Sequence, residues 1–199
     1  MEASQPTPLP DENARDIALM KRVGAGDEQA FRELIERHQN AVIGTVTKML
    51  GNTTDSEDIA QQVFIRIWKS AKRYKPSAKF TTYLYTITRN LVFNETRRRS
   101  RKKEVSADER EENSHSQIED TPHHHPDSEL LQAELQQAVD DAIGALPETQ
   151  RMAVVLRQYE QLSYEEIADV LKTSVSSVKS LLFRARTTLR ESLDRYLSS

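Results

Sequence analysis

The chain has 199 residues and no cysteine, and its 28 Lys and Arg against 31 Asp and Glu give a net charge of −3. The lack of cysteine excludes disulfide-rich secreted folds, thiol enzymes and cysteine-based zinc fingers. No run approaches the ~20 apolar residues of a membrane helix, the first ten residues lack the features of a signal peptide, and the five glycines form no phosphate-binding loop. We therefore expect a cytoplasmic protein that is not driven by a nucleotide.

Charge is strongly segregated along the chain. Residues 66–103 hold 13 Lys and Arg and one acid, residues 104–148 hold 13 acids and one base, and residues 172–190 hold five Lys and Arg and no acid. Two basic regions separated by an acidic one are typical of a nucleic-acid-binding protein. Taken singly, each basic patch is more simply explained as a solvated helix face.

The first half of the chain predicts four helices after a short tail. Residues 1–12 contain three prolines and are expected to be disordered. Apolar side chains then recur every three or four residues. This places helices at about 16–23, 27–51, 55–73 and 81–99. Asp27 is a good N-cap and Gly51 a good C-cap for the second helix, and Asp55, followed by Asp58, is predicted to cap the third.

Apolar residues almost disappear between residues 100 and 128, where Glu, Asp, Ser, His and Pro dominate. Such a segment cannot bury enough surface to offset its ordering entropy, so we expect a linker. Helical periodicity returns at Leu130, and no segment alternates apolar and polar residues as a strand would. The sequence therefore predicts an all-α chain of two small helical domains joined by a flexible acidic linker. The expected parts are a tail (1–12), a first domain (13–100), the linker (101–135) and a second domain (136–199).

The most specific local pattern is a helix-turn-helix in the second domain. Ser163 is an N-cap with Glu166 at the capping-box position, and a short turn after Leu171 leads into a second helix. This second helix has no acid as far as Arg190. The side chains expected to project from it toward a major groove are Ser176, Ser177, Lys179, Ser180, Arg184 and Arg186. An ordinary helical hairpin is the alternative, but a hairpin does not require an acid-free second helix.

A second pattern alternates cations with aromatic residues around Pro76. Its members are Arg73, Tyr74, Lys75, Lys79, Phe80 and Tyr83. Aromatic rings stack on unpaired bases and cations hold phosphates, so this mixture suits single-stranded nucleic acid. The basic surface continues with Arg97, Arg98 and Arg99. The alternatives are that Phe80 and Tyr83 belong to the core and that the arginines form a solvated helix end.

The third predicted helix carries a polar face that core packing does not explain. When Ile59, Val63 and Ile67 are directed inward, a second face remains. It is formed by Asp58, Gln61, Gln62, Ile65 and Lys69. An apolar residue at the centre of a polar face indicates a partner-binding surface, and a solvated face is the alternative.

No set of residues indicates catalysis or a cofactor. The sequence has no acid pair, Ser/His/Asp set or HExxH motif, so we do not predict an enzyme. His115 and the run His123–His125 invite a metal interpretation. Because adjacent histidines point in divergent directions, we expect no metal site there and no other cofactor.

In order and spacing, these motifs resemble the extracytoplasmic-function (ECF) sigma factors, the two-domain initiation subunits of bacterial RNA polymerase. The resemblance covers roughly residues 16–99 and 136–197. It rests on AGDEQAF (25–31), DSEDIAQQVF (55–64), FTTYL (80–84) and TRN (88–90) in the first domain, and on LPETQR (146–151), SYEEIADVL (163–171), VKS (178–180) and RAR (184–186) in the second.

The resemblance implies a subunit without catalytic activity that binds core polymerase and directs promoter recognition, DNA melting and initiation for a specialised regulon. Its polymerase contacts would be the clamp helices of the largest subunit, through the face from Asp58 to Lys69, and the flap of the second largest. The acidic linker would run through positively charged channels of the polymerase. An anti-sigma factor would hold the protein inactive in the bacterial cytoplasm, without membrane insertion.

The resemblance also assigns two DNA-binding surfaces. The minus-ten set is Arg73, Tyr74, Lys75, Lys79, Phe80, Tyr83, Asn90, Arg97, Arg98 and Arg99. The minus-thirty-five set is Ser176, Ser177, Lys179, Ser180, Phe183, Arg184 and Arg186. The chain departs from the family at Gln62, commonly Glu, at Tyr83, commonly Trp, and at Leu181 and Phe183, often Arg and His. The last two departures leave the promoter sequence open.

Two other classes of function would account for part of the sequence. One is a helix-turn-helix transcriptional regulator that is not an initiation subunit; as a response regulator it would need alternating strands and a phosphoacceptor Asp in the first half, and neither is visible. The other is an adaptor that binds only protein, which would show no salt-dependent affinity for DNA.

Overall fold

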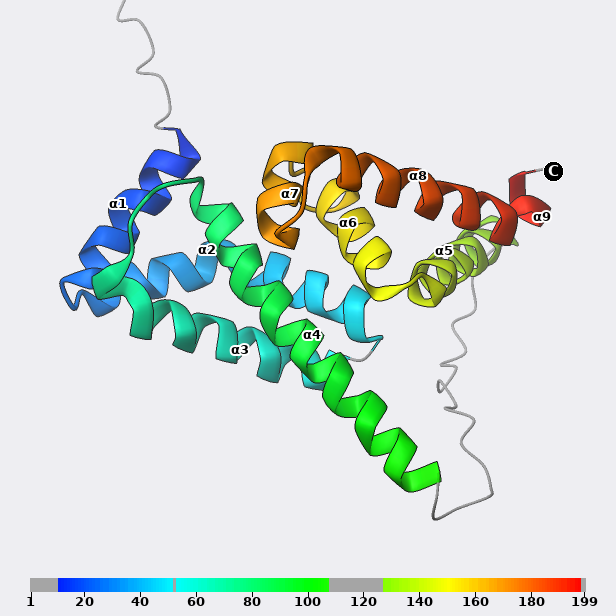
Figure 1. The fold of residues 1–199 in the computed structure, drawn as a ribbon, viewed down its shortest axis with the longest axis horizontal. Coiled ribbons are helices and arrows are strands. Elements are labelled where there is room, and N and C mark those ends of the chain that lie inside the picture. Colours follow the sequence, from blue (N-terminus) through cyan, green and yellow to red (C-terminus); the bar gives the residue numbers. More distant parts are fainter. Residues whose placement is uncertain (1–10, 52, 108–126, 198–199) are drawn as a thin grey trace, which may run out of the picture.

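The computed structural model describes residues 11–51, 53–107 and 127–197, and within these ranges every regular element is a helix. The elements, shown in Figure 1, are α1 (Glu12–Gly24), α2 (Glu28–Leu50), α3 (Thr53–Ser70), the 3-10 helix η1 (Ala71–Arg73), α4 (Phe80–Ala107), α5 (Asp127–Ala145), α6 (Glu148–Gln158), α7 (Tyr164–Leu171), α8 (Val175–Ser192) and α9 (Asp194–Leu197). The predicted all-α class is confirmed.

The first domain, α1 to α4, is held together by apolar stripes on its helices. Leu34, Val42 and Val46 of α2 and Val63 and Ile67 of α3 have no exposed surface. They recur at multiples of a helical turn, and burial of each such side chain contributes about 1.5–3 kcal/mol. These stripes direct α2 toward α1 and α3 and leave the opposite faces of the helices to solvent.

The predicted caps of α2 are confirmed. The Asp27 carboxylate accepts a hydrogen bond from the Ala30 amide at 3.0 Å, and Gly51 ends the helix with a φ of 69°, in the left-handed region that glycine adopts readily. The first helix begins earlier than predicted. Asp11 caps it by accepting a hydrogen bond from the Asn13 amide at 3.3 Å, a local signal that apolar periodicity does not contain.

The predicted cap of α3 is wrong. α3 begins at Thr53, so Asp55 lies within its first turn, where a carboxylate is favoured by the helix dipole. The Asp55 carboxylate forms an ion pair with Arg99 of α4 and thus joins two helices. At its other end α3 stops at Ser70, and the 3-10 helix η1 replaces the predicted last turn.

Helix covers both ends of the predicted linker, residues 101–135. α4 continues to Ala107, and α5 begins at Asp127. Glu95 pairs with Arg98 at 2.7 Å and with Arg99 at 3.0 Å, and pairs at these spacings support a helix that has no apolar stripe. Apolar periodicity alone therefore ends α4 too early. Residues 108–126, which hold six of the 13 acids of residues 104–148, lie outside the described residues.

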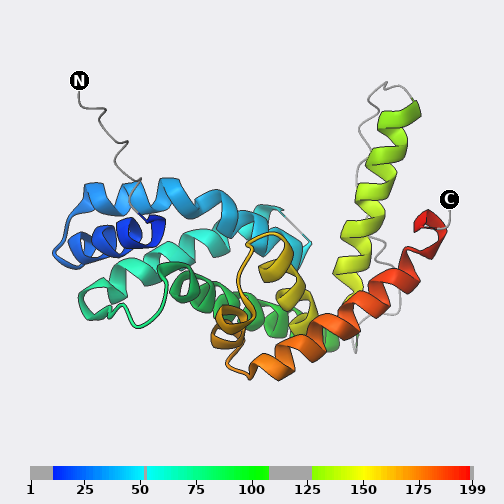
Figure 2. The ribbon, with the colours of Figure 1, turned by 90° about the horizontal axis from the view of Figure 1, so that it is seen from above.

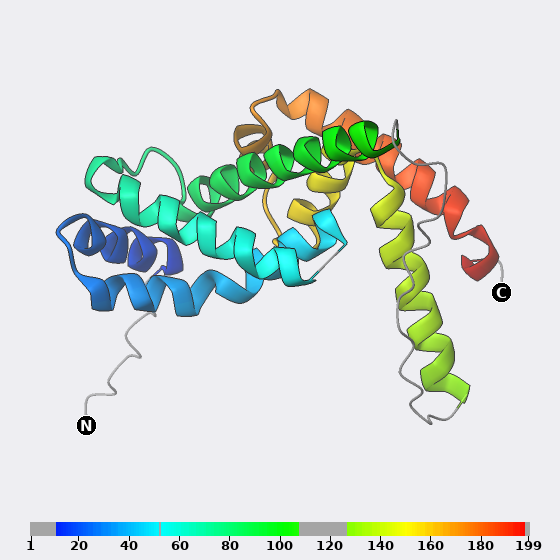
Figure 3. The same cartoon turned by 90° about the horizontal axis from the view of Figure 1, so that it is seen from below.

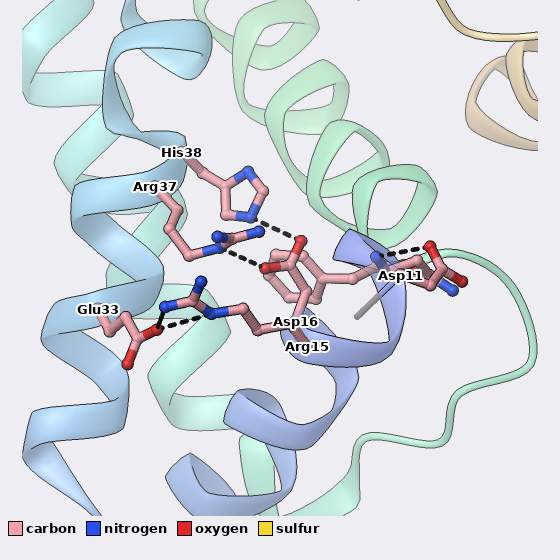
Figure 4. Close-up of polar contacts among 8 residues, drawn as sticks. Asp11, Arg15, Asp16, Glu33, Arg37 and His38 are labelled. Carbon is pink, nitrogen blue, oxygen red and sulfur yellow. Dashed lines mark hydrogen bonds and ion pairs between the residues drawn. The ribbon is translucent and has the colours of Figure 1, made fainter. Parts of the chain in front are cut away.

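A buried carboxylate joins α1 to α2. Asp16, only 2% exposed, accepts a hydrogen bond from Arg37 Nε at 2.8 Å, and its other oxygen lies 2.9 Å from His38 Nε2 (Figure 4). Burial disfavours the ionised carboxylate, but the hydrogen bonds and charges of His38 and Arg37 outweigh it and hold the pKa of Asp16 below its usual 3.8. Arg15 and Glu33 form a second ion pair between the same helices.

The helix-turn-helix is confirmed. Ser163 accepts a hydrogen bond from the Glu166 amide at 3.2 Å, while the Glu166 carboxylate accepts one from the Ser163 amide at 2.7 Å, as in a capping box. Lys172 closes α7 in the left-handed region, with a φ of 55°. The buried residues of the two helices are Ile167, Ala168, Val170 and Leu171 of α7 and Val178, Leu182 and Ala185 of α8.

The two domains lie against each other. α7 packs along α4, while α5 and α6 contact α2, as Figures 1 and 2 show. The remainder of α5 extends away from the first domain beside α8 (Figure 3). Within the described residues, no helix combines the length and apolar character needed to cross a membrane.

We expect Asp16→Asn to lower the free energy of unfolding at pH 7 by about 1–3 kcal/mol, because it weakens hydrogen bonds to charged partners in a buried site. The pKa of Asp16 is lower in the folded protein than in the unfolded chain, so its ionised carboxylate stabilises the fold at pH values above the unfolded pKa. This stabilisation is lost as the pH falls through the folded pKa. The difference between the variant and the unaltered protein should therefore narrow below pH 4 in urea unfolding. Asp169→Asn, at an exposed position, is the control. If the difference in unfolding free energy between Asp16→Asn and the unaltered protein stayed constant down to pH 3, ionisation of Asp16 would not stabilise the fold.

Candidate nucleic-acid and partner interfaces

The outer face of α8 combines an uncharged strip with flanking cations. The strip lies opposite the buried side chains of α8, at spacings of four, three and four residues. It consists of Ser176, Ser180, Phe183 and Thr187. All four side chains are exposed, and Phe183 keeps 70% of its surface. Exposed Lys179 and Arg186 flank the strip on one side and exposed Arg184 on the other.

This arrangement matches the geometry of a major groove, which is about 12 Å wide, admits one helix and has bases at its floor and phosphates at its edges. The uncharged strip would meet the bases, and the cations would meet the phosphates. Ser177, which was also predicted to contact DNA, is half-buried. Its hydroxyl lies 2.9 Å from that of the N-cap residue Ser174, so in this structure it supports the start of α8.

The loop between η1 and α4 presents the cations of the predicted single-strand surface. Arg73, Lys75 and Lys79 are exposed. The aromatic members instead gather with one another: the rings of Tyr74 and Tyr83 are 5.0 Å apart, and both tyrosines are half-buried. Burial, together with the charges of Tyr83 and Asp16, raises the pKa of Tyr74, so its hydroxyl stays neutral.

Phe80 differs from the expectation of a base-stacking residue. Its side chain has no exposed surface, and its ring lies 5.2 Å from that of His38 and 6.4 Å from that of Tyr83. The Phe80 amide also donates a hydrogen bond to Asn13 Oδ1 at 2.9 Å. A ring enclosed in this way has no free face for a base. Phe80 therefore anchors the loop to the core, as the alternative interpretation of this residue had it.

The three predicted arginines of α4 have different surroundings. Arg97 and Arg98 are exposed, and Arg98 is held by Glu95. The hydrogen bond from Arg98, assisted by Arg99, outweighs burial and holds the pKa of Glu95 below its usual range. Arg99 is half-buried and bridges Asp55 and the Leu50 carbonyl oxygen, the latter at 3.2 Å. Arg97 and Arg98 thus both reach solvent, Arg98 within an ion pair with Glu95, whereas Arg99 connects α4 to α2 and α3.

Arg89 of α4 is a residue that the candidate set missed. Its Nη1 donates to Asn90 Oδ1 at 2.7 Å, so it orients a predicted DNA-binding side chain, and its Nη2 donates to the Leu171 carbonyl at 3.1 Å. Its guanidinium lies over the ring of Phe93, 5.3 Å from the centroid. Burial and the nearby charge of Arg97 lower the pKa of Arg89. In the sequence, only its place in the TRN motif distinguishes Arg89. A single cation gives no repeating pattern from which its contacts could be predicted.

The predicted partner face of α3 is open to solvent. Its members Asp58, Gln61, Gln62, Ile65 and Lys69 are all exposed. Ile65 keeps 45% of its surface, and Trp68, three residues further along α3, keeps 37%. The Trp68 ring packs against Phe31 of α2 at 4.9 Å, so it borders the face instead of filling the core. A shallow hollow lined by Phe31, Ile35, Ile65 and Trp68, with Glu28 and Arg32 at its edge, extends the face toward α2.

Among the residues that the structure describes, no group of three or more His, Asp or Glu side chains could hold a metal ion. His115 and His123–His125 lie outside the described residues.

Comparison with known proteins places both domains in one family. The family model described as Sigma-70 region 2 matches residues 34–102, and the one described as Sigma-70, region 4 matches residues 136–189. The ECF RNA polymerase sigma-E factor of Haemophilus influenzae is 35% identical over 181 residues, which cover 88% of this chain and 93% of that protein.

Two solved structures share the fold. CnrH, in complex with the cytosolic domain of CnrY, has a TM-score of 0.67 at 24% identity, covering 91% of this chain and 98% of the other. The sigma factor RpoE of Bartonella quintana, in complex with the anti-sigma factor NepR, has a TM-score of 0.65 at 22% identity, covering 82% of this chain and 96% of the other.

Two helical domains, the second of which carries a helix-turn-helix and both of which match sigma-70 family models, place the chain in the class of sigma-type transcription factors. With both family models matched and a relative at 35% identity across most of its length, the chain belongs to the ECF RNA polymerase sigma factors. The family expected from the sequence is confirmed, and a regulator that is not an initiation subunit is not favoured.

If the α8 cations contact DNA phosphates, replacing one of them should change how DNA affinity depends on salt concentration. Lys179→Ala should weaken binding of mixed-sequence duplex DNA and reduce the slope of log affinity against log salt by about one, since one phosphate contact is lost. Fluorescence anisotropy between 50 and 200 mM salt measures the slope. Lys21→Ala removes an exposed cation at the end of α1 and should leave the slope unchanged. Equal slopes for Lys179→Ala and the unaltered protein would show that Lys179 contacts no phosphate.

Proposed function

We propose that this sigma factor binds core RNA polymerase through the α3 face, opens the minus-ten element with the η1–α4 loop and α4, and reads the minus-thirty-five element with α8. It has no catalytic activity of its own and acts in the bacterial cytoplasm. One observation carries the proposal. The same chain exposes a groove-reading helix, a cationic loop suited to single strands and a partner face centred on Ile65. A simple DNA-binding regulator needs only the first of these.

The α3 face is suited to a polymerase helix because it offers an apolar centre within a polar border. Ile65 supplies the buried contact, while Asp58, Gln61, Gln62 and Lys69 offer hydrogen bonds and charge around it. Interfaces commonly combine a desolvated apolar centre with a polar rim. The partners proposed are the clamp helices of the largest polymerase subunit for this face and the flap of the second largest for the second domain.

For the minus-ten element, exposed Arg73, Lys75 and Lys79 would hold phosphates of the displaced strand, and Arg97 and Arg98 would extend this contact along α4. Half-buried Tyr74 and Tyr83 would lie beside the strand at the loop, and Asn90 would offer its amide to a base. We leave Phe80 and Arg99 out of the direct contacts because the first is buried and the second joins helices.

For the minus-thirty-five element, the proposed contacts divide by chemistry. Ser176, Ser180 and Phe183 face the bases, where a hydroxyl suits several base edges and an apolar ring suits a thymine methyl group. The phosphate contacts would come from Lys179, Arg184 and Arg186. Ser177 would support them from the helix start.

Two further parts of the proposal concern partners. The acidic segment 104–148 would follow positively charged channels of the polymerase as a mimic of nucleic acid. An anti-sigma factor would cover the polymerase- and DNA-binding faces; the Bartonella quintana sigma factor of similar fold is bound to such a partner.

Two matched substitutions separate polymerase binding from DNA binding. Each replaces an exposed apolar side chain with Glu, Ile65→Glu on α3 and Phe183→Glu on α8. Ile65→Glu should weaken binding to core polymerase about tenfold or more, because a charge would have to be desolvated in the contact, and should leave duplex binding unchanged. Phe183→Glu should weaken binding to promoter duplex about tenfold or more, since its charge would face the DNA bases, and should leave binding to core polymerase unchanged.

Titration of labelled protein with core polymerase and with promoter duplex measures both affinities. If Ile65→Glu bound core as tightly as Phe183→Glu did, the α3 face would not be the polymerase contact. If Phe183→Glu bound promoter duplex as tightly as Ile65→Glu did, the outer face of α8 would not be the duplex contact.

A further inference from the structure

Asn90 of α4 is the member of the proposed minus-ten surface whose side chain ends in an amide, and the two ends of an amide have opposite chemistry. Its oxygen accepts hydrogen bonds, whereas its nitrogen donates them. The two ends are nearly equal in size, so a half-turn of the amide exchanges a donor for an acceptor without changing the shape of the side chain. What Asn90 can select on a base therefore depends on what fixes its amide.

The neighbouring residue, Arg89, fixes this amide. Its Nη1 donates a hydrogen bond to Asn90 Oδ1 at 2.7 Å. A guanidinium carries donors and no acceptor, so only the amide oxygen can face it. The amide nitrogen is therefore turned away from Arg89, and because Asn90 is only half-buried, part of its side chain remains open to solvent. An arginine stays protonated across the physiological pH range, so no change of charge releases the amide.

The Arg89 side chain is itself held in place. Consecutive residues of a helix point about 100° apart, so a contact between them requires a long side chain that bends around the helix. Phe93, one turn further along α4, supports this bend, because its ring centroid lies 5.3 Å from the guanidinium carbon. Nη2 donates to the Leu171 carbonyl oxygen at 3.1 Å. The contacts with Asn90 and Phe93 lie within α4, so they do not depend on the second domain.

An amide held in one orientation can distinguish bases that shape alone cannot. The two pyrimidines, cytosine and thymine, are similar in size, and so are the two purines, adenine and guanine. Within each pair, donors and acceptors are exchanged at two neighbouring positions of the Watson–Crick edge: an amino group replaces a carbonyl oxygen, and a bare ring nitrogen replaces a ring N–H. A fixed amide nitrogen thus meets an acceptor on one member of a pair and a donor on the other. An amide free to turn would suit both members.

The energies are sufficient for such a choice. A donor that faces another donor loses its hydrogen bond, and this lowers affinity about tenfold. To avoid the loss, the amide would have to turn its oxygen toward the base and its nitrogen toward Arg89. That turn would place two donors against each other and would break a charge-assisted hydrogen bond, which is stronger than one between neutral groups. Arg89 therefore opposes the turn that would accommodate the wrong base.

We propose that Arg89 is a positioning residue for base selection in the minus-ten element. By donating to Oδ1, it directs the amide nitrogen of Asn90 toward an unpaired base, so that the chain distinguishes cytosine from thymine, or adenine from guanine, at that position. This inference rests on the proposed function, since it requires that Asn90 face a base of the minus-ten element. Arg97 and Arg98 would hold the strand, whereas Arg89 would determine which base Asn90 selects.

Selection from randomised DNA by the holoenzyme tests the proposal. Core polymerase with the full chain is incubated with duplexes that carry a single-stranded segment of random sequence, and the retained strands are sequenced. The position at which Asn90→Ala abolishes a base preference is the one that Asn90 reads. At this position the unaltered protein should enrich one pyrimidine over the other, or one purine over the other, about tenfold.

Two variants change the orientation or the chemistry of the amide. Arg89→Met keeps an apolar stem that can pack on Phe93 but donates no hydrogen bond, so the enrichment ratio should fall to about twofold or less. Asn90→Asp keeps the contact with Arg89 but presents an oxygen to the base, so the preference should invert within the pair. Arg97→Met removes the same charge from an exposed position of α4 and is the matched control. It should lower the retention of all sequences and leave the ratio unchanged.

Co-elution with core polymerase verifies that each variant assembles. If Arg89→Met kept the enrichment ratio of the unaltered protein, or if Asn90→Asp kept its preferred base, Arg89 would not position the amide. If Asn90→Ala altered no position, Asn90 would not read a base, and the inference would be refuted while the proposed function could stand. A holoenzyme that enriched no sequence with the unaltered chain would refute the proposed function itself, so the two failures are distinguishable.

Discussion

The apolar stripe of each helix determines which side chains the protein can offer to a partner. On α3, burial of Ile59, Val63 and Ile67 leaves the face around Ile65 outward. On α8, burial of Val178, Leu182 and Ala185 leaves the strip containing Phe183 outward. Every surface to which a role is assigned is what remains after the cores have been filled. Rotation of either helix would expose apolar side chains and remove the functional face in one step, so fold and function share the same energetic constraint.

Much of the fold and of the candidate surfaces could be predicted from the sequence because the signals for them are local. The capping box at Ser163 and Glu166, the left-handed turn at Gly51 and the apolar periods of α2 and α8 each depend on residues within two turns of one another. The motif order that indicated an ECF sigma factor consists of such local signals. The all-α class and the family were therefore available before any coordinates.

What the sequence did not show depends on contacts between distant residues. Phe80 and Tyr83 lie in the same motif, yet packing against distant residues such as His38 decides that Phe80 is buried. Arg99 looks like its neighbours Arg97 and Arg98 until Asp55, far away in the chain, is placed beside it. Contacts between the two domains are the clearest such case, because Thr45 and Tyr85 have no pattern that points to their hydrogen-bond acceptor Glu160. Single polar contacts across domains carry no periodicity.

Charge connects the parts of the account. The basic first domain faces acceptors of the second domain in the free chain, and the same cations would face phosphates in a promoter complex. A polyanion would compete with the Glu166 carboxylate for Lys79, so DNA binding and the contact between α7 and the start of α4 would be linked.

The most direct test of the central claim is run-off transcription with bacterial core RNA polymerase on a pool of genomic promoter fragments, with and without this protein. Transcripts with defined start sites should appear only when the protein is added, from fragments sharing two elements at fixed spacing. Binding of the protein to core polymerase without any promoter-dependent transcript from the genome that encodes it would contradict the account.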